Sequence, residues 1–152
     1  MATNSRREQI LVAYKALLDE LTSIKKVDRR QPTSPEDLSR IAGTQMPFIA
    51  MIGGVPQPQE HINSRMPGGV DVMISELQVK LFVYFMDNAT ADTTLSDILD
   101  DVWVKTYSDQ TLGLRFVQKM LIDPNTDVAV WDPYVAFSLV VSIFYKHSVG
   151  GI

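Results

Sequence analysis

The sequence predicts an α+β (α/β) fold, a mixed, mainly antiparallel sheet of about four to five strands packed against two main helices. The strongest indication is the run Tyr134–His147, where every odd position up to Tyr145 is apolar, as in a strand that packs one face on a core. A second is Arg6–Lys25, whose apolar residues recur with the spacing of one helix face. A third is Val55–Gly69, a Pro- and Gly-rich segment that follows neither period and predicts a long loop. At this length we expect one domain spanning residues 1–152.

The final predicted strand has a second face of different character. Its even positions mix small, polar and apolar groups: Ala136, Ser138, Val140, Ser142, Phe144 and Lys146. Such a face is too apolar to be simply solvated and too mixed to be a continuous core. It suits a sheet that lies partly against a neighbouring molecule, and the alternative is a central strand covered by the protein's own helices.

Capping residues predict where the helices begin. Ser5 and Glu8 form a capping box at the start of the helix Arg6–Lys25. The segment Ser34–Ala42 opens with an N-cap residue and a proline at the first helical position, which predicts a short helix. A second main helix, Leu95–Tyr107, follows two threonines that can cap it.

Further apolar runs predict the other strands of the sheet. They are Phe48–Ile52, Val70–Met86, Leu114–Ile122 and Val128–Trp131. The parity of the apolar positions changes near Ser75–Glu76, so a bulge or a change of partner is expected there. The turn-forming segment Asp123–Asp127 should reverse the chain. The residues expected in the core are Leu17, Leu21, Leu81, Val83, Leu139 and Val141.

Charge is unevenly distributed along the chain. Residues 1–30 hold seven basic and four acidic side chains, a net +3, which leaves −7 on the rest of a chain whose total is −4. A basic first helix on an acidic body can steer association between copies or bring one edge near nucleic acid, and the alternative is an ordinary solvated helix face. The acidic total disfavours a dedicated DNA-binding module, because phosphate contacts need clustered positive charge.

Residues that carry catalysis or bind metals form no recognisable set. Cysteine is absent, and the two histidines, His61 and His147, lack the spacing of paired metal ligands. Three carboxylates on one predicted helix, Asp97, Asp100 and Asp101, fit its solvated face better than a Mg²⁺ or acid–base site. We therefore expect no catalytic, cofactor-binding or metal-binding residues, and no enzymatic activity.

The order of these elements resembles a tail terminator protein of tailed bacteriophages. The resemblance covers nearly the whole chain and rests on the first helix, the strand Phe48–Ile52 with Gly53-Gly54, the long strand Leu77–Phe85, the helix Leu95–Tyr107 and a closing hairpin around Asp123–Asp127. It is a pattern of element order, length and hydrophobicity without an invariant motif. Head-closure, stopper and adaptor proteins of the phage neck share the same size class and are alternatives.

The resemblance implies a structural virion protein that acts by assembly. Such subunits form a ring, a hexamer in this class, that caps the tail tube, ends its polymerisation and joins the tail to head-completion or stopper proteins. In contractile-tailed phages the ring also contacts the sheath, and DNA passes through its lumen without specific binding. We therefore expect a homo-oligomer assembled in the host cytoplasm and located in the virion, with no membrane partner.

Protein–protein contacts are expected at the basic first turn, in the long loop and beside the last strand. The residues predicted to make them are Arg6, Arg7, Gln57, Gln59, His61, Asn63, Arg65, Trp131 and Tyr134. For Trp131 the alternative is core packing. Two other classes of protein stay open: a small ligand-binding or catalytic domain with the long loop as a lid, and a nucleic-acid-binding module that stacks bases on Phe82 and Tyr84.

Overall fold

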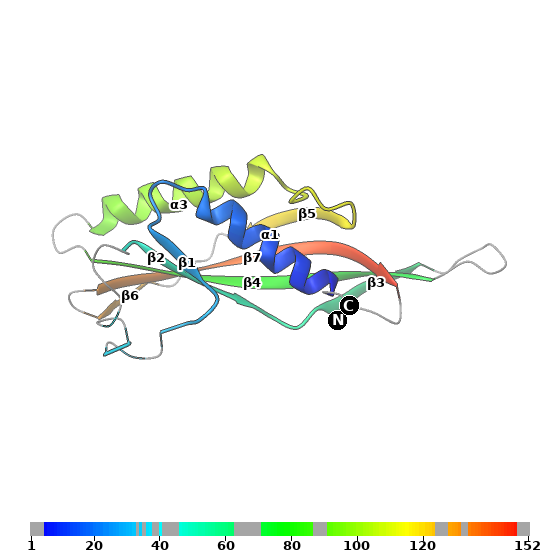
Figure 1. Ribbon diagram of the computed structural model, residues 1–152, viewed down its shortest axis with the longest axis horizontal. Coiled ribbons are helices and arrows are strands. Elements are labelled where there is room, and N and C mark those ends of the chain that lie inside the picture. Colours follow the sequence, from blue (N-terminus) through cyan, green and yellow to red (C-terminus); the bar gives the residue numbers. More distant parts are fainter. Residues whose placement is uncertain are drawn as a thin grey trace.

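The computed structural model describes residues 5–32, 34, 36–37, 40, 46–62, 71–86, 91–123, 128–131 and 134–148. It confirms the α+β class: two helices in the described part of the chain, α1 (Arg6–Asp19) and α3 (Ala91–Ser108), cover one face of a mixed seven-stranded sheet (Figure 1). The sheet therefore has more strands than the sequence predicts.

Two long antiparallel strands form the centre of the sheet. β4 (Val72–Met86) and β7 (Tyr134–Ser148) pair along their whole length without a register shift. Shorter strands line their outer edges in pairs, β2 and β3 along β4, and β5 and β6 along β7, while β1 pairs with β2 in parallel. The bounds of these strands are β1 Lys26–Asp28, β2 Phe48–Gly53, β3 Gln57–Ile62, β5 Val117–Asp123 and β6 Val128–Trp131.

The predicted loop Val55–Gly69 is wrong in its first half, which forms β3. The prolines in this segment suggested a loop, but a proline is tolerated in an edge strand or beside a bulge. β3 pairs only with β4, and its register shifts between Pro58 and Glu60. The polar segment Gln57–Ile62 thus becomes a strand because the edge of β4 offers it backbone hydrogen bonds, although its composition does not favour a strand.

The parity change near Ser75–Glu76 marks a change of partner. β3 pairs with β4 as far as Glu76, and β2 takes over from Val79 onward. Pairing with β7 continues through this point without interruption, so β4 itself carries no bulge.

The chain does not reverse at Asp123–Asp127, contrary to the prediction. β5 and β6 both run antiparallel to β7 and follow one another along the same edge. The reversal comes instead between β6 and β7, where Trp131 pairs with Tyr134. The closing hairpin is therefore formed by β6 and β7 rather than by β5 and β6.

Helix α1 begins where predicted and ends earlier than Lys25. The Ser5 hydroxyl accepts a hydrogen bond of 3.2 Å from the Glu8 N–H, which caps the first turn. Glu20 then caps the C-terminus by donating its N–H to two carbonyls of the last turn. Ile24 keeps the helical spacing of apolar residues, but it is buried on the segment that leads into β1.

The core lies between the helices and the odd-numbered side chains of β4 and β7. α1 and α3 supply apolar residues from one face each, and Leu81, Val83, Leu139 and Val141 are fully buried beneath them. Leu17 is buried as predicted, whereas Leu21 is only partly buried at the edge of this cluster. Within the described ranges, no helix has the length and apolar character needed to cross a membrane.

The short helix predicted at Ser34–Ala42 lies largely outside the described residues. The Ser34 hydroxyl accepts a hydrogen bond of 3.2 Å from the Asp37 N–H, in agreement with its predicted role as N-cap.

Candidate interaction surfaces

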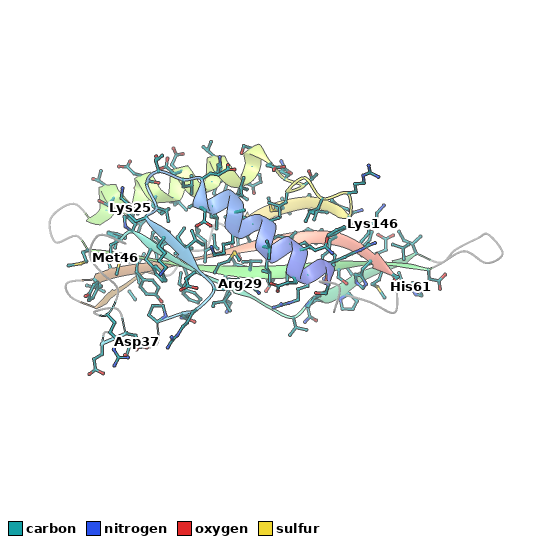
Figure 2. The ribbon with its side chains drawn as sticks, in the orientation of Figure 1. Lys25, Arg29, Asp37, Met46, His61 and Lys146 are labelled. Carbon is teal, nitrogen blue, oxygen red and sulfur yellow. The ribbon has the colours of Figure 1, made fainter. Side chains whose placement is uncertain are left out.

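The predicted contact residues fall at the two ends of the long strand pair. β3, with Gln57, Gln59 and His61, pairs with the first residues of β4, whereas Tyr134 begins β7 at the opposite end. Figure 2 shows His61 and Lys146 toward one end, and Met46 and Asp37 toward the other. Asn63 and Arg65 lie outside the described residues.

β3 is an edge strand whose side chains are exposed on both faces. All six residues of β3 are exposed, and one of its two edges has no paired strand within the described sheet. The Gln59 amide donates to the Glu76 carboxylate at 3.3 Å, and His61 Nε2 lies 3.3 Å from Asp71 Oδ2. The free edge offers backbone donors and acceptors, so it is suited to pairing with another chain.

Arg6 and Arg7 direct their guanidinium groups at this subunit's own backbone. Arg7 donates to the carbonyls of Gly53 and Gly54, each at 3.0 Å. Arg6 donates to the Lys146 carbonyl, and its guanidinium lies 4.9 Å from the centre of the Phe116 ring. Both arginines therefore fasten the first turn of α1 to the sheet.

Gly53 permits this close approach of α1. A Cβ at that position would lie 2.8 Å from Leu11 Cδ1 and 3.0 Å from the Arg7 guanidinium. A side chain there would displace the Leu11 side chain and the Arg7 guanidinium from their positions against β2. From the sequence, Gly53-Gly54 could be interpreted only as the end of a strand. Its contact with Arg7 and Leu11 exists only after α1 packs on the sheet.

The face of the sheet opposite the helices carries a polar cluster around Glu76. The Glu76 carboxylate accepts hydrogen bonds from Ser142 at 2.8 Å, Gln78 at 3.2 Å and Gln59 at 3.3 Å. These donors come from β7, β4 and β3, so the register of three strands builds the cluster. All three donors are neutral, so none of these contacts places a positive charge beside the carboxylate.

An aromatic cluster covers the same face at the other end of the sheet. Met46, Phe48, Ala50 and Tyr84 are buried there, with Phe82, Tyr134 and Ala136 packed against them. Burial raises the pKa of Tyr84, an effect that its hydrogen bond with Gln31 partly offsets. Since Tyr84 is only 2% exposed, it offers no free ring for base stacking, whereas Phe82 is partly buried at the edge of the cluster.

Trp131 and Tyr134 close the β6–β7 hairpin. The two residues pair across the turn, and Tyr134 is partly buried against the aromatic cluster. β6 itself presents exposed valines, Val128 and Val130, which are 56% and 66% exposed. This end of the sheet is therefore an apolar counterpart to the polar strand β3.

A hydroxyl–imidazole pair lies at the β3 end of the molecule. Ser75 Oγ is 2.7 Å from His147 Nε2, and His147 Nδ1 is 2.7 Å from the Ser148 carbonyl, to which it donates. Sequence reasoning missed this pair because its members are far apart in the chain and meet only through the β4–β7 register. Ser75 and His147 are 1% and 4% exposed, so no substrate can reach the hydroxyl.

Two shallow hollows open on the described surface. One, of about 200 Å³, is lined by Lys26, Asp28, Arg30, Pro32, Asp37, Arg40 and Phe48. The other, of about 450 Å³, is lined by Arg6, Val72, Arg115, Phe116, Lys146, His147 and Ser148. Among the described residues, no group of three or more histidine, aspartate or glutamate side chains could hold a metal ion.

Comparison of the chain with protein-family models and with curated protein sequences found no match.

Proposed function

We propose that this chain is a structural subunit that assembles into a closed ring, caps the tail tube of a tailed bacteriophage and joins the tail to its neck proteins. The observation that carries the proposal is the one-sided fold. Both described helices cover one sheet face, which leaves the polar cluster around Glu76 on the other face and the edge of β3 accessible for contact with neighbours. The order of elements in the sequence, which resembles a tail terminator, specifies the kind of assembly.

The proposed mechanism is steric and symmetric. A head-to-tail interface that closes on itself ends lateral growth, and a ring built in this way has two unlike faces. The subunit also has two unlike ends, polar and hydrogen-bonding at β3, and apolar at the β6–β7 hairpin. One end can therefore meet the tube and the other the neck, while DNA passes through the lumen.

A complementation experiment tests the proposed function. Phage that lack this protein should accumulate tails of abnormal length without heads, and the parent protein should restore joined particles. The triple variant Gln57→Ala, Gln59→Ala, His61→Ala should restore far fewer, because it removes the polar contacts of β3. Its fold should be intact, since exposed substitutions usually change the free energy of unfolding by less than about 0.5 kcal/mol.

The matched control replaces three exposed residues elsewhere, Thr22→Ala, Lys25→Ala and Gln118→Ala. This variant should complement like the parent. Normal, joined particles in the complete absence of the protein would refute the proposed function.

A further inference from the structure

The larger hollow gathers positive charge at one end of the molecule. Three cationic side chains line it, Arg6 from the start of α1, Arg115 from the segment before β5, and Lys146 from the end of β7. No aspartate or glutamate is among the described residues that line it. Figure 2 shows Lys146 beside the first turn of α1.

These cations are not neutralised within the described part of the subunit. Arg6 bonds to the Lys146 carbonyl and lies over the Phe116 ring, both of which leave its charge in place. Arg115 and Lys146 are exposed, and no carboxylate of the described residues lies within 4.0 Å of either. The hollow therefore presents a preorganised guanidinium and two free cations to an anionic ligand.

The remaining wall of the hollow indicates which kind of anion fits. Val72 and Phe116 contribute apolar surface beside the cations, and the volume of about 450 Å³ exceeds that of a single anionic group. A nucleic-acid backbone is bound by cations spread along a surface, at the spacing of successive phosphates. A compact hollow with one apolar wall instead suits carboxylate side chains that stand next to an apolar residue, as on a protein surface.

The accessible face of α3 carries carboxylate side chains next to an apolar residue. Asp97, Asp100, Asp101 and Val104 recur with the spacing of one helix face, away from the buried Ile98 and Val102; Asp97, Asp100 and Val104 are exposed and Asp101 is partly exposed. Val104 is 60% exposed, and the three aspartates make no ion pair with described residues. We call these four residues the α3 stripe.

We propose that the hollow receives the α3 stripe of a second copy of this chain. The charges are complementary, with three cations facing three carboxylates, and Val104 would lie against the apolar wall. Because the hollow and the stripe are different surfaces of the subunit, the contact is head-to-tail and can repeat around a ring. This inference rests on the proposed function and specifies the interface between its subunits.

Reversal of charge on each side of the contact tests the inference. Sedimentation velocity should show self-association of the parent protein, weakened by salt because the contact is electrostatic. The hollow variant, Arg115→Glu with Lys146→Glu, and the stripe variant, Asp100→Lys with Asp101→Lys, should each raise the dissociation constant about tenfold or more. Arg115, Lys146 and Asp100 are exposed and Asp101 is partly exposed, and Arg6 is left intact because it holds α1 against the sheet.

Mixing the two variants provides the specific readout. In the mixture the native hollow of one variant meets the native stripe of the other, and the reversed hollow and reversed stripe are again complementary. The mixture should therefore associate more tightly than either variant alone. The matched control Lys25→Glu reverses an exposed lysine between α1 and β1, outside both surfaces, and should associate like the parent.

Several outcomes would overturn the inference. They are a parent that stays monomeric at all concentrations, a hollow variant that associates normally, and a mixture that does not recover association. Loss of binding to a short DNA duplex in the hollow variant, with self-association unchanged, would assign the hollow to nucleic acid instead. A hollow variant that associates normally, while the parent caps tail tubes, would refute this interface and leave the proposed function standing.

Discussion

The contact between α1 and α3 depends on one buried hydrogen bond that can be tested by a double-mutant cycle. Tyr14 Oη lies 2.8 Å from Thr106 Oγ1, and both residues are 0% exposed. The two substitutions, Tyr14→Phe and Thr106→Val, each remove one hydroxyl and keep the shape of the side chain. They therefore change the polar pairing with little effect on packing.

The two single variants should differ in cost. After Tyr14→Phe, the Thr106 hydroxyl can turn to a carbonyl of its own helix, so the loss should be about 0.5–1.5 kcal/mol. After Thr106→Val, the Tyr14 hydroxyl stays buried without its partner, which costs about 1–3 kcal/mol. The double variant leaves neither hydroxyl orphaned and should be no less stable than Thr106→Val. The coupling energy should then be about 1 kcal/mol.

Urea denaturation followed by circular dichroism measures these differences. The midpoint should shift while the slope stays constant, so that the shift reports stability alone. Two single effects that add to within about 0.3 kcal/mol would show that the hydroxyls do not interact, and would refute the described docking of α1 on α3.

Three further variants or conditions test other parts of the structure. Leu139→Ala should lower the free energy of unfolding by about 2–5 kcal/mol, because the side chain is fully buried between the sheet and the helices, and an unchanged thermal melt would contradict that placement. Arg7→Ala should cost about 1–3 kcal/mol in a urea titration, since it leaves the Gly53 and Gly54 carbonyls without their donor, and a neutral result would show that the arginine does not fasten α1. Burial raises the pKa of Tyr14 above its usual 10.0, so the unfolded chain loses this proton first as the pH rises. Stability should be constant below about pH 10 and fall above it by up to about 1.4 kcal/mol per pH unit for this group, and Tyr14→Phe should reduce the slope.

Patterns that depend on local sequence predicted much of this fold. The alternation in Tyr134–His147 identified β7 and its buried face, and Ser5 with Glu8 identified the start of α1. β1 and β3 were missed because neither has the composition of a strand. Each forms because a neighbouring strand offers a free edge, and this is a property of the assembled sheet.

The candidate surfaces were less predictable than the fold, because they depend on register and on docking between distant segments. Sequence reasoning selected Arg6 and Arg7 as exposed contacts, but their positions against Lys146 and Gly53 could not be foreseen without the docking of α1. The cluster at Glu76 likewise requires the pairing of three strands. The exposed stripe of α3 could be predicted, since helical spacing alone separates its aspartates from the buried face.

Electron microscopy of the purified protein mixed with its tail-tube protein tests the proposed function most directly. A ring-forming terminator should appear as one closed ring with an open centre at a single end of each tube, and tubes formed in its presence should stop growing. The parent and the Lys25→Glu control should behave alike. Tubes that keep growing with bare ends, while the protein stays a compact monomer in solution, would contradict the proposal.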